Sequence, residues 1–314
     1  MKVVQINSYG GVDVLEVNTN APKPSFSKGQ VLVEIHSVSI NPFDWKVRAG
    51  YFKDMMPLTF PATLGGDFAG VVLETNEEMS DFKKGDEVYG SANIFNGGSG
   101  SFAEFAAVNI KNTALKPKTL SFEEAGSLPL VGASAVQALE EHIKLQRGFK
   151  ILIHGGAGGI GHIAIQLAKV LGAFVATTVS TSDTDYVKKL GADNVIDYKT
   201  EDFVTLVKDF DAVFDTVGGE ITNKSFKVIK KGGILVSMAG KPDEKLAEEY
   251  DITVIGQGTD TNTLHLNRLT ELIDTGKIKV NIDKVFTIDQ SKEAFKHLEE
   301  NHPRGKVVIK IINH

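Results

Sequence analysis

Residues 150–161 read KILIHGGAGGIG, in which a short apolar strand pattern runs directly into a glycine-rich turn. The next stretch, HIAIQLAKVLG at 162–172, has the apolar spacing of an amphipathic helix. Gly155, Gly158 and Gly161 recur at three-residue intervals, which allows a tight turn and a close approach of the backbone to a ligand. The N-terminus of the following helix offers unpaired N–H groups and a positive dipole end. The stretch therefore predicts a site for the pyrophosphate of a dinucleotide.

A glycine-rich turn alone is weak evidence, because many turns between strands and helices contain glycine. Here it opens a regular series of short apolar segments separated by helical patterns. These segments predict six strands, at 150–154, 174–179, 194–197, 211–215, 233–238 and 251–256. Gly172 and Gly191 follow the first two helical patterns, where a left-handed residue commonly ends a helix. The series predicts a doubly wound parallel sheet, with the glycine turn where the strand order reverses.

The two ends of the chain have a different pattern. From residue 1 to about 120, short β-branched runs are broken by glycine and proline, which predicts an antiparallel β domain. Helical spacing begins at residue 122, with Ser121 as its N-cap. After residue 259, a helical pattern and a final strand pattern exceed what a dinucleotide fold needs. We therefore expect a first domain at 1–121, a dinucleotide-binding domain at 122–258, and a segment at 259–314 that completes the first domain.

The composition narrows the chemistry. The chain has no cysteine, which excludes disulfides, thiolate zinc sites, iron–sulfur clusters and cysteine nucleophiles. Its eight histidines show no metal-ligand spacing such as HExxH. The 34 Lys and Arg residues are dispersed and the net charge is -6, so we expect neither a nucleic acid nor a membrane as a partner. The N-terminal stretch MKVVQINSYGG lacks the apolar segment of a secretory signal, so we expect a cytoplasmic protein.

The end of the second strand pattern bears on the choice of nicotinamide cofactor. An acidic residue there would bind the free 2′-hydroxyl of NAD, whereas this chain has VSTS. The hydroxyls of Ser180, Thr181 and Ser182 can donate to a 2′-phosphate, and Tyr198, after the third strand, can close over it. The pattern favours NADPH, although no arginine is at hand and Asp183 lies beside the serines. The alternative role of Asp183 is a helix N-cap with its carboxylate turned away.

A set of motifs along the chain carries a resemblance to a known family. The motifs are INPFDWKVRAG at 40–50, GGDFAG at 65–70, KKGDEVYG at 83–90, GSFAEF at 100–105, GGAGGIG at 155–161 and GKVVIKI at 305–311. In this order they resemble the zeta-crystallin-like quinone oxidoreductases, the zinc-free branch of the medium-chain dehydrogenase/reductase superfamily. The wording NPxDxKxRxG and the ending NHPRGKVVIKII are similar to the enone and alkenal reductases of that branch.

The resemblance implies an α/β protein with two domains and an active site in the cleft between them. It implies a GroES-like antiparallel β catalytic domain made from both chain ends, a central Rossmann domain with a doubly wound parallel sheet, and a homodimer. Zinc-dependent relatives have a GHE motif where this chain has Gly65, Gly66 and Asp67, so the resemblance also implies that the catalytic metal is absent.

The resemblance further implies which residues bind the cofactor. They are Gly159 and Ile160 beside Gly158 at the pyrophosphate, Ser180, Thr181, Ser182 and Tyr198 at the adenosine phosphate, Val217 and Met238 at the nicotinamide, and Gly305 and Lys306 in the C-terminal segment that closes the cleft.

Without a metal to polarise a simple ketone, reduction of an activated acceptor is easier to explain than oxidation of an alcohol. We therefore expect an NADPH-dependent oxidoreductase that transfers hydride to a quinone or a small α,β-unsaturated carbonyl compound. Two alternatives stay open. One is a zinc-free dehydrogenase for another carbonyl substrate, and the other is a non-catalytic protein that binds NADPH for redox sensing.

Lys46 matches the lysine of NPxDxKxRxG, which makes it the first candidate to contact the cofactor ribose and the oxyanion that develops on the substrate. Its alternative is a solvated lysine at a strand end. Asn41 is a candidate to orient the nicotinamide carboxamide or the substrate carbonyl. Its alternative is to shape a turn before Pro42.

Tyr51 and Tyr89 are candidate proton donors, and their alternative is a place in the core or in the wall of the cleft. We expect Asp44 and Arg48 to form a supporting ion pair rather than to act on the substrate.

Overall fold

The computed structural model describes residues 1–75 and 82–312. The chain divides into two compact units. The first unit contains Met1–Ala133, Thr261–Asp274 and Val280–His314, and the second contains Ser134–Asp260 and Thr275–Lys279. The chain enters the second unit within helix α3, Pro129–Val136. No helix among the described residues is long and apolar enough to cross a membrane.

The second unit is built on a six-stranded sheet in which every pair of neighbours is parallel. Its order is β11-β10-β9-β12-β13-β14, which is the doubly wound order that the series of apolar segments predicts. The strands are β9 (Lys150–His154), β10 (Phe174–Val179), β11 (Asn194–Asp197), β12 (Phe210–Asp215), β13 (Ile229–Ser237) and β14 (Thr253–Gly256). The order reverses between β9 and β12, so the glycine turn after β9 lies at the switch point.

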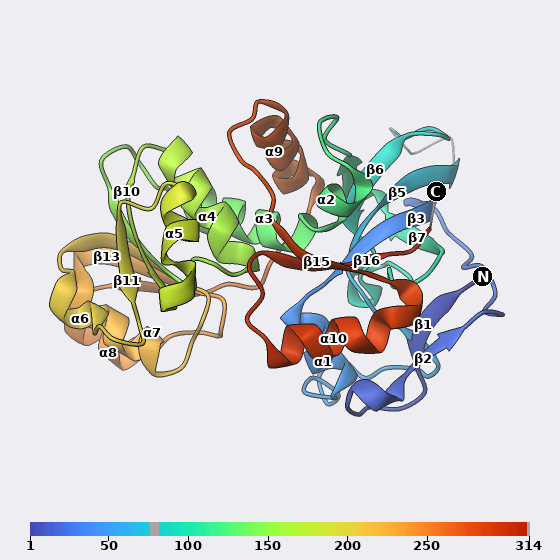
Figure 1. Cartoon of the computed structure of the whole chain (residues 1–314), viewed down its shortest axis with the longest axis horizontal. Helices are drawn as coiled ribbons and strands as arrows, with labels where there is room; N and C mark the ends of the chain where they lie inside the picture. Colours follow the sequence, from blue (N-terminus) through green and yellow to red (C-terminus); the bar gives the residue numbers. More distant parts are fainter. Residues whose placement is uncertain (76–81, 313–314) are drawn as a thin grey trace. The chain divides into compact units, whose positions relative to one another are not determined.

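Helices alternate with these strands along the chain (Figure 1). They are α4 (Gly159–Val170), α5 (Thr184–Lys189), α6 (Phe203–Leu206), α7 (Glu220–Ser225) and α8 (Glu244–Tyr250). Gly172 and Gly191 follow α4 and α5 with φ angles of +84° and +104°, as the C-terminal signals predict. In this unit, α3 is followed directly by a π-helical segment, Gln137–His142.

Three strands of this sheet differ from their predicted limits. β12 begins one residue before its predicted start, at Phe210, and β13 ends one residue before its predicted end, at Ser237. β13 begins at Ile229 rather than residue 233, because the exposed lysines after Ile229 interrupt the apolar pattern without interrupting the strand. β14 begins at Thr253 rather than residue 251, because Asp251 has a φ of 56° and ends helix α8.

The first unit contains a seven-stranded sheet, in which the path β15-β16-β3-β5-β6-β8 is joined by β7 on β3, and a three-stranded sheet, β2-β1-β4. All pairs are antiparallel except β15 with β16. The strands are β1 (Val3–Ile6), β2 (Leu15–Asn18), β3 (Gln30–Ile40), β4 (Ala62–Thr63), β5 (Asp67–Thr75), β6 (Glu87–Ser91), β7 (Phe105–Asn109), β8 (Thr113–Leu115), β15 (Ile282–Thr287) and β16 (Lys306–Lys310).

Helices of the first unit are α1 (Pro42–Arg48), α2 (Phe122–Gly126), α9 (Thr263–Asp274), α10 (Ser291–Glu300) and the first part of α3. Figure 1 shows α10 running alongside β15 and β16 and next to α1. Ser121 is the N-cap of α2, as predicted, and its hydroxyl accepts the Glu124 N–H at 3.2 Å. The Glu124 carboxylate in turn accepts the Ser121 N–H at 2.9 Å, which completes a capping box.

The register of the large sheet brings distant residues together. Val307 on β16 lies opposite Ile40 on β3, which brings Lys306 beside Asn41, the residue after β3. On the other side of β3, the pairing of Val38 with Phe68 aligns Ser39 with Asp67 at the start of β5. Buried aliphatic and aromatic side chains, among them Ile40, Phe68 and Val307, form the core around these strand ends.

Candidate functional site

The glycine turn has the geometry of a pyrophosphate site. Gly155 has a φ of +74°, and Gly158 is the N-cap of α4. A β-carbon on Gly161 would lie 2.2 Å from the Gly155 carbonyl oxygen, so this glycine lets the helix pack against the turn. A β-carbon on Gly158 would meet only that same oxygen, at 3.4 Å, which leaves its outer face open to a ligand. These are the separate tasks of helix packing and of backbone approach to an anion.

The predicted cofactor residues of the second unit lie at one edge of its sheet. Gly158, Gly159 and Ile160 follow β9, Ser180, Thr181 and Ser182 follow β10, Tyr198 follows β11, Val217 follows β12 and Met238 follows β13. Because all six strands are parallel, these positions share the carboxyl edge of the sheet, where doubly wound folds bind their ligands. Tyr198 and Val217 are half exposed there.

Asp215 was not predicted, yet it organises the loop after β12. Its carboxylate is fully buried and accepts the N–H groups of Val217 at 2.9 Å and Gly218 at 3.0 Å, together with the Thr222 hydroxyl. The Met238 N–H donates to the Asp215 carbonyl at 2.8 Å. Asp215 therefore fixes both residues assigned to the nicotinamide. The only signal in the sequence is an acidic residue at a strand end before a Gly-Gly pair.

His154, at the end of β9, is also buried and structural. Its Nδ1 lies 2.9 Å from the Thr178 hydroxyl and its Nε2 lies 3.0 Å from the Ser225 hydroxyl. Burial lowers the pKa of His154 from 6.5 to about 4, although the nearby Asp215 carboxylate acts in the opposite direction. The ring is therefore neutral at physiological pH and ties β9, β10 and α7 together.

The hydroxyls expected to bind a 2′-phosphate are engaged by carboxylates. Ser180 donates to Asp183 at 2.7 Å and lies 2.9 Å from the Ser182 hydroxyl, and Thr181 donates to Asp197. Asp183 lies at the N-cap position of α5, as its alternative role has it, but its carboxylate makes no capping hydrogen bond and accepts the Ser180 hydroxyl instead. The hydrogen bond from Thr181 is the largest of the effects that lower the pKa of Asp197. Negative charge therefore lies against these hydroxyls.

In the first unit, the candidates Lys46 and Tyr51 lie on or directly after α1. Lys46 lies in this helix and not at a strand end. Its ammonium lies 5.7 Å from the centre of the Trp45 ring, and the Tyr51 ring meets the same indole edge-on at 5.5 Å. The Tyr51 side chain is 68% exposed. Asn41 is the N-cap of α1, with Pro42 at the first helical position, so it begins a helix rather than a simple turn.

Asn41, Asp67 and Lys306 form a buried polar cluster. The Lys306 ammonium donates to the Ile40 carbonyl at 3.0 Å and to the Asn41 amide oxygen, and it lies 3.7 Å from the Asp67 carboxylate. The Asn41 amide nitrogen donates to Asp67 at 2.8 Å. Asp67 also accepts the Ser39 hydroxyl at 2.8 Å and the N–H of Leu130 at 2.9 Å. Both the oxygen and the nitrogen of the Asn41 amide are thus hydrogen-bonded, and the ammonium group of Lys306 is buried inside the first unit.

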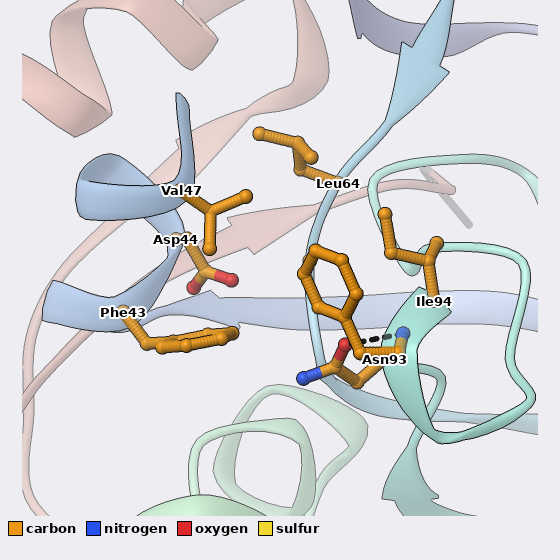
Figure 2. Close-up of a pocket in the computed structure, with 8 residues that line it drawn as sticks. Phe43, Asp44, Val47, Leu64, Asn93 and Ile94 are labelled. Atoms are coloured by element: carbon orange, nitrogen blue, oxygen red, sulfur yellow. Dashed lines mark hydrogen bonds between the residues drawn. The ribbon is translucent and has the colours of Figure 1, made fainter. Parts of the chain in front are cut away.

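Asp44 lies beside this cluster and lines a small cavity. One carboxyl oxygen of Asp44 accepts the Asn41 N–H at 2.7 Å. Burial raises the pKa of Asp44 from 3.8 to about 7, and the Asp67 carboxylate adds to the rise, whereas the Asn41 hydrogen bond and Lys306 oppose it. The cavity is lined by Phe43, Asp44, Val47, Leu64, Gly65, Asn93, Ile94 and Phe95, and Figure 2 shows the Asp44 carboxyl among these mostly apolar side chains.

One expectation for this unit is corrected, and for Tyr89 the alternative of a core position is confirmed. Arg48 does not pair with Asp44, because its guanidinium forms two hydrogen bonds with Glu299 on α10, at 2.8 and 3.0 Å. Tyr89 is a core tyrosine. It is fully buried, and its hydroxyl donates to the Leu266 carbonyl at 2.6 Å.

The residues of this site do not fit a catalytic zinc ion. The chain has no cysteine, and Gly65 and Gly66 precede Asp67. Both oxygens of the Asp67 carboxylate are already occupied by hydrogen bonds, and a buried lysine lies beside it. Among residues 1–75 and 82–312, no group of three or more His, Cys, Asp or Glu side chains could hold a metal ion. The cluster has the donors of an ion-pair network, not those of a metal site.

Comparisons with known proteins agree with this architecture. Residues 27–118 match the alcohol dehydrogenase GroES-like domain family, and residues 190–309 match the zinc-binding dehydrogenase family. The chain is 41% identical to a 2-methylene-furan-3-one reductase of Solanum lycopersicum, over 98% of this chain and 79% of that protein. It is 39% identical to a chloroplastic NADPH-dependent alkenal/one oxidoreductase of Arabidopsis thaliana, again over 98% of this chain and 79% of the relative.

Among solved structures, a quinone oxidoreductase from Coxiella burnetii is 33% identical and superposes with a TM-score of 0.90, over 99% of both chains. Both ends of the chain and its central sheet are therefore shared with these enzymes. The chain belongs to the medium-chain dehydrogenase/reductase superfamily, within the branch that contains the quinone and alkenal oxidoreductases.

Proposed function

We propose that this protein is an NADPH-dependent reductase that transfers hydride to a quinone or to a small α,β-unsaturated carbonyl compound. The proposal rests on one observation above all. The second unit has the sheet edge at which doubly wound folds bind dinucleotides. The first unit has, among its described residues, a buried cluster of Asn41, Asp67 and Lys306 whose side chains do not suit zinc. The names of the relatives, which describe alkenal/one, furanone and quinone oxidoreductases, support the same substrate class.

When bound, NADPH supplies the hydride. We propose that the N–H groups of Gly159 and Ile160 hold its pyrophosphate, because they open α4 at the open face of Gly158. Ser180, Thr181, Ser182 and Tyr198 are proposed to surround the adenosine phosphate. Val217 and Met238, both held by Asp215, are proposed to line the nicotinamide.

We propose that Lys46 donates a hydrogen bond to the carbonyl oxygen that becomes negative, and that it also contacts the cofactor ribose. Tyr51 is proposed to stabilise the Lys46 segment through Trp45. Asn41 has a narrower role than direct contact with the substrate. Its amide is held by Lys306 and Asp67, so we propose that it positions α1. Gly305 and Lys306 are proposed to complete the site from the C-terminal segment.

We also propose that the units correspond to a cofactor domain near residues 122–258 and a catalytic domain made from both chain ends, and that the protein is a cytoplasmic homodimer. Size-exclusion chromatography with light scattering tests the dimer, and cell fractionation tests the location.

The test of function follows oxidation of NADPH and NADH at 340 nm with purified protein. The acceptors are small enones, enals, quinones, simple ketones and aldehydes. We expect turnover of enones or quinones with NADPH and none of simple ketones. Turnover of simple carbonyls alone would support a dehydrogenase instead. Tight NADPH binding without turnover of any acceptor would support a redox-sensing role.

A further inference from the structure

Among residues 1–75 and 82–312, the charged side chains buried around α1 form ion pairs, with the exception of Asp44. Lys306 on β16 pairs with Asp67 on β5, at 3.7 Å. Arg48, on α1 itself, pairs with Glu299 on α10, at 2.8 Å. Each of these two buried cations therefore already has a carboxylate partner. In the part of the chain that the structure describes, no cation is left to pair with Asp44 in the same way. A second carboxylate next to an already neutral pair is costly to ionise, so Asp44 keeps its proton to a higher pH than an ordinary carboxyl group.

The carboxyl group of Asp44 borders a small cavity into which it can release its proton. Asp44 is 5% exposed, and the hydrogen bond from the Asn41 N–H fixes the orientation of its carboxyl group. The same carboxyl group faces the cavity formed with Phe43, Leu64 and Ile94 (Figure 2). The cavity volume is about 10 Å³, close to the least that one water molecule requires. The side chain of Asn93 is the other polar group of the lining.

We propose that Asp44 is the proton source for the carbon-protonation step of enone reduction, and that its proton crosses this cavity through one water molecule. The inference rests on the proposed reductase function, and it adds the proton donor of that same site. Lys306 and Asp67 act as positioning residues in this scheme. They hold the Asn41 amide, and the Asn41 N–H holds the carboxyl group of Asp44.

The step balances in atoms and electrons. Hydride from NADPH forms a C–H bond at the β-carbon of the enone, and the electrons of the C=C bond move to the carbonyl oxygen as an enolate. The cavity water gives a proton to the α-carbon and takes the proton of Asp44, whose O–H bond breaks. Asp44 is left as a carboxylate and regains a proton from solvent. The sum is reduction of one enone by NADPH and one proton.

The pKa of about 7 for Asp44 suits this role, because a general acid works best when its pKa is near the operating pH. The carboxyl group is protonated at the start of a cycle and can be reprotonated afterwards. Reduction of a quinone places its protons on oxygen atoms that exchange directly with water. It therefore does not need a donor to carbon, and this difference separates a chemical role of Asp44 from a structural one.

The test compares Asp44→Asn with a control that makes the same change in another capping box, Glu124→Gln. Both residues occupy the third position of a helix and accept the N–H of their N-cap, and both replacements keep the accepting oxygen. Turnover of methyl vinyl ketone and of menadione with NADPH is measured from pH 5.5 to 9. For Asp44→Asn we expect a loss of kcat of about a hundredfold or more with the enone and less than about threefold with the quinone.

In the parent protein and in Glu124→Gln, kcat for the enone should fall as the pH rises through about 7, and this dependence should be missing in Asp44→Asn. An equal loss for both acceptors, or an unchanged pH profile for the enone, would overturn the proposal. If Asp44→Asn does not fold, the test is the comparison of the enone and quinone pH profiles of the parent protein. An enone profile that parallels the quinone profile above pH 7 then contradicts the role. If the parent protein reduces neither acceptor, the proposed function fails rather than this inference.

Discussion

The ammonium of Lys306 lies 3.7 Å from the carboxylate of Asp67 although 239 residues separate them in the chain, and both side chains are almost fully buried. The pair exists because β16 and β5 flank β3 on opposite sides, so that residues from both neighbours meet where β3 ends. Zinc-dependent relatives are expected to carry their GHE motif near this place. Here an ion pair with hydrogen bonds to Ser39 and Asn41 occupies it instead.

The first prediction concerns the stability of this pair. Lys306→Met leaves Asp67 as a buried carboxylate without its cation, and such a loss typically costs about 3 to 5 kcal/mol. The control is Lys310→Met on the same strand, whose pair with Glu123 at 3.4 Å is partly exposed and contributes at most about 1 kcal/mol. Urea unfolding followed by fluorescence of Trp45, the single tryptophan, reports on the first unit. Equal midpoints for the two variants would contradict the prediction.

The second prediction separates the two tasks of the glycine turn. Gly161→Ala places a β-carbon 2.2 Å from the Gly155 carbonyl oxygen, so we expect the second unit to lose stability by about 2 kcal/mol or more. Gly158→Ala meets that oxygen at only 3.4 Å and keeps a permitted φ of -75°. The Gly158→Ala protein should fold normally but bind NADPH at least tenfold more weakly, because its methyl group occupies the space that the pyrophosphate is proposed to fill.

Thermal melts and NADPH fluorescence titrations measure the two effects of these glycine substitutions. Normal NADPH affinity in a folded Gly158→Ala protein would show that the pyrophosphate does not approach this glycine.

The third prediction is a pH dependence of stability that originates in His154. Its pKa is lowered from 6.5 to about 4 in the folded protein, so below pH 6.5 the unfolded chain binds a proton that the folded chain does not. Stability is therefore lost as the pH falls from 6.5 to 4, by up to roughly 3 kcal/mol for a shift of this size. His154→Asn should remove this part of the slope. His302→Asn, at an exposed position, should keep it.

Calorimetric unfolding of these histidine variants at pH 4.5, 5.5 and 7 gives the comparison. Parallel curves for the parent protein and His154→Asn would refute the assignment to His154.

How much of the fold the sequence predicts depends on how local the signal is. β9, β10 and β11 begin and end at the predicted residues. For β9 and β10 the reason is burial, because inner strands of a parallel sheet are covered on both faces and are mostly apolar. Helix α1 was not predicted. Its signals were nevertheless present, with Asn41 as N-cap, Pro42 at the first position and Asp44 at the third. Seven residues are too few for a helical period to show, so the sequence offers only a possible turn at Asn41.

In the candidate site, too, residues marked by a local sequence pattern could be predicted, and residues brought together by strand pairing could not. The place of residues 180–182 and Tyr198 at one edge of the sheet could be predicted, because they follow predicted strands of one parallel sheet. Val217 and Met238 are expected only from the family resemblance, and contact of all these residues with the cofactor stays a prediction. The cluster of Asn41, Asp67 and Lys306 could not, because it depends on the registers of β16 and β5 on β3. No local pattern fixes pairings between strands so far apart in the sequence. The engagement of Ser180 by Asp183 was missed because propensity places a residue at a helix end but does not orient its carboxylate.

The fourth prediction concerns cofactor choice. Asp183 and Asp197 accept hydrogen bonds from Ser180 and Thr181, so a 2′-phosphate must displace these contacts and meets negative charge. We expect NADPH to be preferred by only several-fold over NADH. Asp183→Asn should raise the preference about tenfold, which corresponds to about 1.4 kcal/mol, chiefly through a lower Kd for NADPH, because one negative charge that repels the phosphate is removed. The control is Asp185→Asn, an exposed position two residues on.

Dissociation constants for both cofactors, measured at low and high salt, supply the test of the Asp183 prediction. A lower affinity for NADPH in Asp183→Asn would mean that Asp183 orients Ser180 for the phosphate rather than opposing it.

The last prediction concerns Lys46. Lys46→Met keeps the length of the side chain and removes the donor and the charge, so the helix and its contact with Trp45 should remain. One charged hydrogen bond to a developing oxyanion is typically worth about 2.7 to 4 kcal/mol, which is roughly a hundred- to a thousandfold in kcat. Quinones should lose less, because their reduction is more favourable and depends less on stabilisation of an enolate. The control is Lys53→Met, which removes an exposed lysine of the following turn.

Steady-state kinetics with an enone and a quinone distinguish the roles that Lys46 can have. A fall in kcat for the enone with little change in the KM for NADPH indicates contact with the oxyanion. A raised KM for NADPH with a smaller change in kcat indicates contact with the ribose. Asp44→Asn, unlike Lys46→Met, should also remove the fall of kcat for the enone as the pH rises through about 7, because that fall comes from the carboxyl group of Asp44. If Lys46→Met changes neither parameter with either acceptor, Lys46 is a surface residue and its assignment to the site is wrong.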